Sequence, residues 1–115
     1  IPIKEDIRDK KHLIQRLESI LKEFIDDEGL GNESLVILVE EYEEFMRKFD
    51  QGIAKWKFTN KLTGNPDEVL VSSVTNFKGL EANMVIYIHT ISAPDNINYI
   101  AYTRAKFYLH ELVVK

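Results

Sequence analysis

The sequence predicts an α/β protein with an open, mostly parallel sheet and helices on both of its faces. Short continuous apolar runs, such as residues 34–39 and 84–88, are typical of strands that are buried on both sides. Between these runs lie segments with apolar residues at three- and four-residue spacing, which indicate amphipathic helices. Because helices and strands alternate, we expect right-handed crossovers between parallel strands, with ligands gathering at the carboxyl ends of the strands.

The composition bounds this prediction. The chain has 115 residues, which suffice for one buried core but not for two, so residues 1–115 are expected to form a single domain. Its formal net charge of -4 has the wrong sign for holding nucleic acid by overall charge, so any contact with DNA must be local. It has no cysteine, which excludes disulfides and cysteine-ligated metal sites. No apolar run approaches the roughly 20 residues of a spanning helix, so we expect no membrane contact and a cytoplasmic location.

The first third of the chain predicts a helix, a strand and a second helix. Residues 6–27 carry one apolar stripe at helical spacing, and Gly29 with Gly31 ends the helix. Residues 34–39 predict a strand, after which a run of acids brings negative charge to the first turn of the next helix, as the helix dipole favours. An apolar run followed by acids also resembles a Walker B strand, but no Gly-x-x-x-x-Gly-Lys-Ser/Thr loop accompanies it. The acids are Glu40, Glu41, Glu43 and Glu44.

The middle of the chain predicts two strands joined by a loop. Residues 53–58 alternate apolar and polar from Ala54 onward, which favours an edge strand with one wet face and a half-buried Trp56. Residues 60–67 contain a Gly-Asn-Pro-Asp turn and predict a loop. The next segment, residues 68–73, predicts a central strand.

The last third predicts a strand, a helix and a closing strand. The strand at residues 84–88 is followed by Ser-Ala-Pro-Asp, which has the cap and the early proline of a helix start. We expect this helix to run from about Asp95 to Lys106. Residues 107–114 are rich in branched and aromatic side chains and predict the final strand.

Two short motifs lie in the second half of this pattern. Residues 71–81 read Val-Ser-Ser-Val-Thr-Asn-Phe-Lys-Gly-Leu-Glu, and residues 99–106 read Tyr-Ile-Ala-Tyr-Thr-Arg-Ala-Lys. They resemble motifs V and VI of the UvrD/Rep-like superfamily 1 helicases, which commonly read Thr-x-His-x-x-Lys-Gly-Leu-Glu and Tyr-Val-Ala-x-Thr-Arg-Ala-(Lys/Arg). The two motifs stand in the family's order. The resemblance covers the last part of the chain, and the first part fits the expected order of elements in the same domain.

The resemblance implies that residues of both motifs contact ATP. Glu81 falls where the family accepts a hydrogen bond from a ribose hydroxyl. Gly79 lets the backbone pass close to a ligand or adopt a conformation that a side chain would forbid. Lys78 and Thr103 are further candidates for contact with the nucleotide, and for Lys78 a structural role is the alternative.

The resemblance also implies a contact with single-stranded DNA. Ser73, Thr75 and Asn76 fall where the family meets the DNA backbone, and their hydroxyl and amide groups suit phosphate contacts that position a strand without reading its sequence. Thr75 stands where the family usually has His, a departure that weakens this part of the resemblance.

Arg104 carries the strongest functional prediction. A planar guanidinium can grip two phosphate oxygens at once and neutralise charge that develops during phosphoryl transfer. In the family, the motif VI arginine reaches the γ-phosphate of ATP held, with its Mg²⁺, by the other RecA-like domain. Arg104 is therefore expected to be a catalytic arginine finger. The structural alternative is that Arg104 caps its own helix or forms a salt bridge at the helix end.

The chain lacks the Walker A loop that a complete ATPase needs, and it begins with Ile1 and not with Met. Together with the motifs, this implies the second RecA-like domain of an ATP-dependent DNA helicase, excised from a longer protein. Its expected partners are the N-terminal RecA-like domain of the same protein, ATP and single-stranded DNA. Alone it is expected not to hydrolyse ATP.

Two other functions stay open. A degenerate helicase-like module that serves as a protein-interaction platform is favoured by the acidic balance and by the missing histidine of motif V. A stand-alone α/β domain that binds a nucleotide or phosphate would make the two motifs a coincidence.

Overall fold

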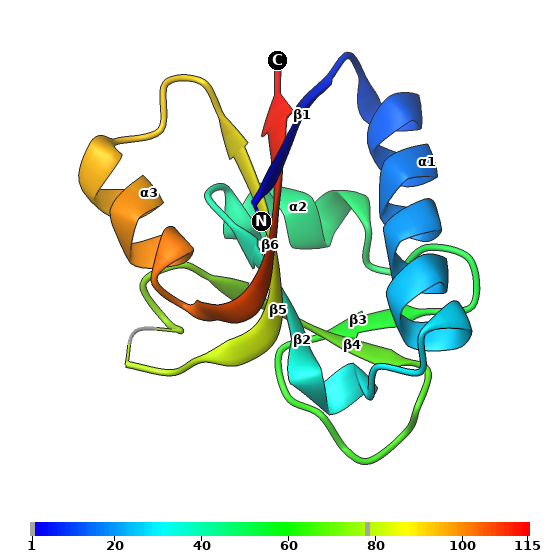
Figure 1. Ribbon diagram of the computed structural model, residues 1–115. Helices are drawn as coiled ribbons and strands as arrows, with labels where there is room; N and C mark the ends of the chain where they lie inside the picture. The colour runs from blue at the N-terminus through cyan, green and yellow to red at the C-terminus, as the bar shows by residue number, and fades with distance from the viewer. Residues whose placement is uncertain (1, 78) are drawn as a thin grey trace.

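The computed structural model describes residues 2–77 and 79–115, which form one six-stranded sheet flanked by three α-helices (Figure 1). The strands are β1 (Ile3–Ile7), β2 (Leu35–Val39), β3 (Lys57–Thr59), β4 (Glu68–Ser73), β5 (Ala82–Thr90) and β6 (Ala105–Val114). The α-helices are α1 (Lys10–Leu21), α2 (Tyr42–Lys48) and α3 (Asp95–Tyr102). A π-helical segment, Lys22–Asp27, continues α1, and a short 3-10 helix, Asn32–Ser34, leads into β2.

The sheet has the strand order β1-β6-β5-β2-β4-β3, and all five neighbouring pairs are parallel. This confirms the predicted α/β fold with an open sheet, which is wholly parallel over the described residues. At the start of β6 the register with β5 shifts, so that Ala82 pairs with Ala105 but Met84 pairs with Tyr108. β1 pairs only with the second half of β6, from His110 onward.

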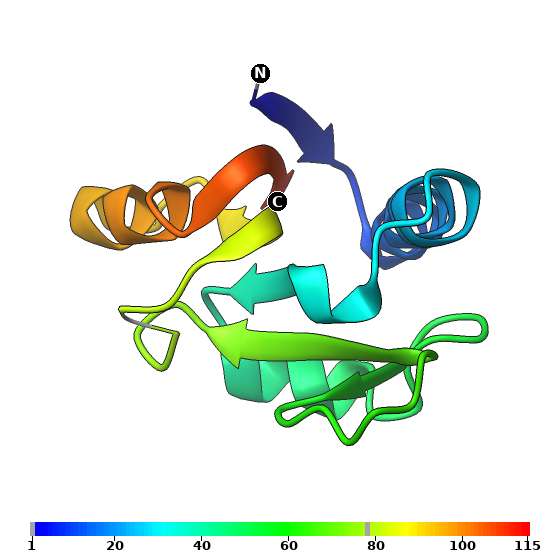
Figure 2. The ribbon, with the colours of Figure 1, turned by 60° about the horizontal axis from the view of Figure 1, so that its bottom comes forward.

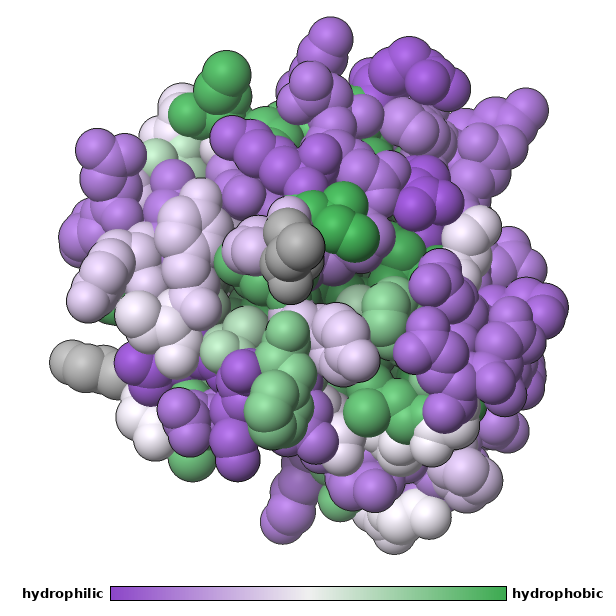
Figure 3. Space-filling view, in the orientation of Figure 1, coloured by the Kyte–Doolittle hydropathy of each residue, from purple (hydrophilic) through white to green (hydrophobic). Residues whose placement is uncertain are grey.

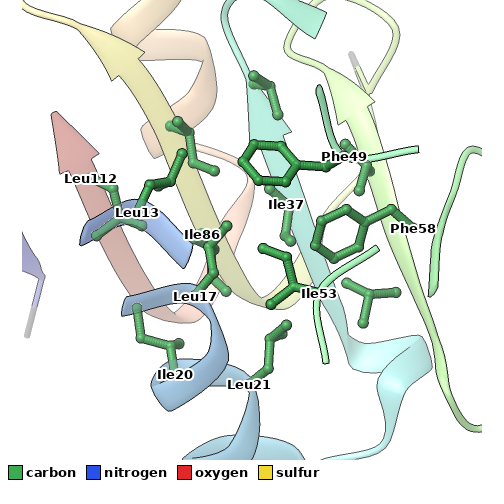
Figure 4. Close-up of a cluster of buried hydrophobic side chains, with 14 of the residues drawn as sticks. Leu13, Leu17, Ile20, Leu21, Ile37, Phe49, Ile53, Phe58, Ile86 and Leu112 are labelled. Atoms are coloured by element: carbon green, nitrogen blue, oxygen red, sulfur yellow. The ribbon is translucent and has the colours of Figure 1, made fainter. Parts of the chain in front are cut away.

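One face of the sheet is covered by α1 and α2. Leu17, Ile20 and Leu21 of α1 point towards Ile37 and Ile86 in the sheet (Figure 4). Burial of such side chains is the main stabilising contribution to a core of this kind, and truncating one to alanine typically costs about 2–5 kcal/mol. The outward face of α1 is charged, and the corresponding side of the molecule is mostly hydrophilic (Figure 3).

The opposite face is covered by α3 and by the segment between β4 and β5. Ala101 of α3 packs against Val85 and Tyr87 of β5, while Val74 and Phe77 of the connecting segment are buried in the same cluster. Figure 1 and Figure 2 show α1 and α3 on opposite sides of the sheet. The expectation of helices on both faces is therefore confirmed.

The start of the chain differs from the prediction, because β1 occupies the residues just before α1. The predicted helix began at Asp6, but Asp6 and Ile7 belong to the strand, and α1 starts after Asp9, whose carboxylate accepts from the backbone N–H of His12 at 2.9 Å. The sequence signal for β1 is weak because an edge strand has one neighbour, and within Ile-Lys-Glu-Asp-Ile only Ile7 is buried.

The predicted edge strand at residues 53–58 is also displaced. Residues 53–56 form a tight turn closed by two backbone hydrogen bonds between Ile53 and Trp56, both 3.0 Å, with Ala54 in the left-handed region at φ 54°. The strand itself covers Lys57–Thr59. Trp56 is only 3% exposed and belongs to the core under α1 and α2, so its predicted half-buried position is wrong. The turn directs its ring inward, which strand alternation alone cannot predict.

The predicted helix at residues 95–106 is shorter than expected. It ends at Tyr102, and β6 begins at Ala105 rather than at residue 107. Arg104 therefore lies in the two-residue connection between α3 and β6. The helical spacing continues past this point in the sequence, but backbone pairing with β5 takes over at Ala105.

β1 is anchored by a partly buried ionic cluster. Arg16 of α1 makes a bidentate contact with the Glu5 carboxylate, at 2.7 Å and 2.8 Å, and His110 Nε2 of β6 contacts the same carboxylate. The Arg16 hydrogen bond is the main reason why the pKa of Glu5 falls to about 2.

This depressed pKa predicts acid-dependent stability. Since the folded pKa of Glu5 lies below its ordinary value of 4.5, the stabilisation is present above about pH 5 and is lost as the pH falls towards 2. Glu5→Gln should remove roughly 2 kcal/mol of unfolding free energy at pH 7 and flatten the loss between pH 5 and pH 2.5. Urea denaturation across this pH range measures both effects. Glu18→Gln, an exposed carboxylate of α1, should keep the wild-type profile; an unchanged acid slope in Glu5→Gln would contradict the prediction.

Candidate functional site

The two motifs meet at the amino end of the sheet. Glu81 directly precedes β5 and Arg104 directly precedes β6, and these strands are neighbours whose first residues, Ala82 and Ala105, are paired. The backbone N–H of Ala82 donates to the Arg104 carbonyl at 2.9 Å. Backbone pairing of β5 with β6 therefore holds Glu81 and Arg104 together at the amino end of the sheet, although they are far apart in the sequence.

The first motif does not lie wholly at this edge. Ser73 ends β4 and is level with Val39 of β2, which in turn is level with Ile88 near the end of β5. Ala82 lies six residues before Ile88, so Ser73 and Arg104 are roughly 20 Å apart along the strand direction. The expectations that residues 73–81 share one edge with Arg104, and that the site lies at carboxyl ends, are wrong for this reason. The segment between β4 and β5 runs back along the sheet, and its described residues, 74–77 and 79–81, contain no helix.

This segment begins with a turn that exposes the predicted DNA-binding residues. The Ser73 hydroxyl accepts from the backbone N–H of Asn76 at 3.1 Å, and the side chains of Thr75 and Asn76 are exposed. Gly79 has φ +83°, and a Cβ there would meet no atom within 4 Å, so its backbone conformation and not space favours glycine. The prediction for Lys78 lies outside the described residues.

Acidic residues surround the carboxyl end where Ser73 lies. Val39, the partner of Ser73, is followed by Glu40 and Glu41, and α2 carries two more acids in its first turn, as predicted. Glu40 is not placed as a Walker B residue. Its Oε1 accepts from the backbone N–H and the hydroxyl of Thr90, at 2.8 Å and 3.0 Å, and so ties the end of β2 to that of β5.

The Arg104 guanidinium is half-buried and contacts only neutral acceptors. Nε donates to the Ile100 carbonyl at 3.3 Å, Nη1 to the Leu80 carbonyl at 3.3 Å, and Nη2 to the Thr103 hydroxyl at 3.1 Å. Thr103 in turn donates to the Ile100 carbonyl at 2.8 Å. The bond to Ile100 caps α3, as the structural alternative expected. The Leu80 bond joins the second motif to the first, and over the described residues no carboxylate forms a salt bridge with Arg104.

A buried polar cluster further along β5 and β6 was missed by the sequence reasoning. His89 of β5 and Glu111 of β6 are 6% and 7% exposed, and their side chains meet at 2.5 Å between Nε2 and Oε2. The same Glu111 oxygen accepts from the hydroxyl of Tyr102, the last residue of α3, at 2.7 Å. The sequence did contain a signal for this cluster, because His89 and Glu111 each lie within a largely apolar strand sequence. Such groups are seldom buried without a polar partner.

Two hollows open on the surface near these elements. One, of about 180 Å³, lies at the carboxyl ends of β2 and β5 and is lined by acids and by core side chains of α2. The other, of about 400 Å³, lies beside the first half of β6 and is lined by Tyr102, Phe107 and Glu111 among others. Within residues 2–77 and 79–115, no group of three or more His, Asp or Glu side chains is arranged to hold a metal ion.

Comparison with known proteins gives matches among solved structures. The chain matches no model of a known protein family and no curated protein. Among solved structures it is similar to the C-terminal domain of a possible DNA helicase from Lactobacillus plantarum WCFS1, with a TM-score of 0.74 and 16% sequence identity. The match covers 98% of this chain and 73% of that one. The chain therefore shares the fold of that C-terminal domain. In the described part of the chain, no helix has the length and apolar character needed to cross a membrane.

The contacts of Arg104 predict that it contributes little to stability. Its acceptors are neutral and partly exposed, so Arg104→Ala in the 115-residue chain should lower the unfolding free energy by about 1 kcal/mol or less. Leu17→Ala, at a fully buried core position, should cost about 2–5 kcal/mol. Urea denaturation of both variants gives the comparison, and equal losses would show that Arg104 is chiefly a structural residue.

Proposed function

We propose that this chain is the second motor domain of an ATP-dependent DNA helicase resembling the UvrD/Rep-like superfamily 1 enzymes. The observation that carries the proposal is the junction of Glu81 and Arg104 at one edge of a sheet with the helicase C-terminal fold. Each motif alone is short. Two motifs that lie far apart in the sequence but are joined by a side-chain bond from Arg104 to the Leu80 carbonyl support a shared site.

In this proposal Arg104 is the catalytic residue, and it acts on ATP and Mg²⁺ held by an N-terminal RecA-like domain of the same protein. Its charge is available because its hydrogen bonds go to two carbonyls and a hydroxyl, which an incoming phosphate can replace. Phosphate oxygens would receive two parallel N–H bonds from the guanidinium as charge develops on them. Thr103, which accepts from Nη2, would steady the side chain.

The remaining nucleotide contacts come from the first motif. Glu81 is exposed, and its carboxylate can accept a hydrogen bond from a ribose hydroxyl. The positive φ of Gly79 turns the backbone just before it, and Lys78 completes the proposed set. These residues do not supply the converging backbone amides of a phosphate-binding loop. In this proposal, ATP affinity must therefore come mainly from the other domain.

Single-stranded DNA would contact the opposite end of the sheet, through Ser73, Thr75 and Asn76. These side chains can donate to phosphate oxygens, but the neighbouring acids make the surrounding potential unfavourable for a polyanion. We therefore expect a narrow contact that positions the strand, with little salt-dependent affinity from this domain. In this proposal the nucleotide and the DNA would contact opposite ends of the sheet.

A second candidate function is a degenerate helicase-like module that binds another protein. Several large apolar side chains are exposed on or near the proposed nucleotide edge, including Leu80 at 55%, Tyr99 at 70% and Phe107 at 67%. Exposed apolar groups of this kind are common at protein interfaces. Closure against an ATP-bound N-terminal domain would also cover these side chains, so their exposure fits both candidate functions. ATP turnover of the full-length protein decides between them.

The helicase proposal predicts that Arg104→Ala in the full-length protein abolishes most DNA-stimulated ATP turnover. Arginine fingers contribute about three to five decades of rate in related phosphoryl transfers, which corresponds to roughly 4–7 kcal/mol of transition-state stabilisation. Steady-state ATP hydrolysis and the thermal midpoint should be measured on the same preparation. Arg47→Ala, an exposed arginine at the end of α2, is the control and should retain wild-type turnover. Near-normal turnover in Arg104→Ala would refute the assignment and favour the interaction module.

A further prediction concerns the 115-residue chain by itself. Without a phosphate loop it should bind ATP with a dissociation constant above about 1 mM, since the contacts available amount to less than roughly 4 kcal/mol. Titration calorimetry or NMR shift mapping with Mg-ATP tests this, and the residues that shift first should be those next to Arg104. Micromolar binding or robust hydrolysis by this chain would favour the stand-alone nucleotide binder instead.

A further inference from the structure

The direction of the Arg104 side chain depends on the last turn of α3. On the strand side, the Arg104 carbonyl is fixed by the backbone N–H of Ala82. On the helix side, the Arg104 N–H donates to the Ala101 carbonyl at 3.1 Å, and its Nε donates to that of Ile100. Movement of the helix end would therefore move the guanidinium directly.

Apolar packing holds α3 to the sheet only weakly. Ala101 is its one buried residue, and Ile97 and Ile100 are partly buried. An alanine contributes little apolar area, so the polar contacts of α3 add to what fixes the position of the helix. Two side-chain hydrogen bonds reach α3 from the sheet, and one of them is made by Tyr102, two residues before Arg104.

The acceptor of the Tyr102 bond is itself fixed. His89 Nδ1 lies 2.7 Å from the Thr90 carbonyl and its Nε2 lies 2.5 Å from Oε2 of the buried Glu111, so both ring nitrogens have a partner. The ring of Tyr87 stacks on His89 at 4.3 Å and meets the ring of Tyr102 edge-on at 6.1 Å. Both groups of the buried pair are thus held in one geometry.

A pair of this kind is a poor source of stability. Desolvation of a buried carboxylate and imidazole offsets most of their attraction. Replacing such a pair by well-packed apolar side chains often leaves the stability of a protein unchanged or higher. What the pair does provide is a strong, immobile acceptor at one point beneath the end of α3. Burial, followed by the Glu111 hydrogen bond, raises the pKa of Tyr102 to about 12, so the phenol stays a donor at neutral pH.

We infer that Tyr102, held by the buried Glu111–His89 pair, is the positioning residue for Arg104. This inference rests on the proposed function, in which Arg104 acts on a phosphate. Tyr102 touches neither nucleotide nor reacting atoms; it sets the helix end from which Arg104 extends. The pattern of the second motif leaves this position open, so the motif itself assigns Tyr102 no role.

The test is Tyr102→Phe in the full-length protein, which removes the hydroxyl and keeps the ring. We expect kcat for ATP hydrolysis to fall about tenfold, the factor that corresponds to about 1.4 kcal/mol, with KM for ATP changed less than about twofold. Tyr108→Phe is the matched control, because Tyr108 has similar exposure, 44% against 38%, and its hydroxyl has no hydrogen bond to the described residues. It should keep wild-type kcat and KM.

A double-mutant cycle distinguishes positioning from a general loss of stability. If Tyr102 acts through Arg104, Tyr102→Phe should have no further effect on turnover in an Arg104→Ala background. Multiplicative losses, or a wild-type kcat in Tyr102→Phe while Arg104→Ala is inactive, would overturn the positioning role and leave the proposed function standing. Normal turnover in Arg104→Ala would overturn the proposed function and the positioning role together.

Discussion

All six strands run in the same direction, and this constraint decides where functional residues can lie. In a parallel sheet the first residues of neighbouring strands share one edge, so the pairing of Ala82 with Ala105 brings the residues before them together. A parallel sheet also needs both of its faces covered. Here α1 and α2 cover one face, and α3 with residues 74–77 covers the other. A segment that carries motif residues is thus also part of the covering layer. Its buried Val74 and Phe77 flank the exposed Thr75 and Asn76.

The fold could be predicted where the local signal is strong. β2 and residues 84–88 of β5 are continuous apolar runs with both faces buried, and their short length favours strands over helices. β1 could not be recognised, because its charged residues are stabilised by distant partners, as in the Glu5 contact with Arg16 and His110. Trp56 was misplaced because a turn with Ala54 at positive φ overrides the alternation of the neighbouring residues.

The candidate site shows the same division. The motifs selected Glu81 and Arg104, and pairing of two strands is enough to bring them together once the sheet is known. The end of the sheet at which they lie could not be predicted, since it depends on how the connection between β4 and β5 runs back along the sheet. The cluster of Tyr102, His89 and Glu111 was out of reach for a different reason. It joins residues from three elements, and a lone polar residue in a strand does not identify its partner.

The first half of β6 has a consequence for how this domain behaves as a separate molecule. Among residues 2–77 and 79–115, β1 pairs with the outer side of β6 only from His110 onward, so residues 105–109 have no partner strand on that side within this part of the chain, and the ring of Phe107 is exposed. Open edges next to apolar side chains are templates for self-association. The register shift between Ala105 and Tyr108 twists this edge, and the charge of Lys106 lies on it, both of which hinder a second strand from pairing in register. Lys106 and the register shift are therefore the two local features that oppose self-association through this part of β6.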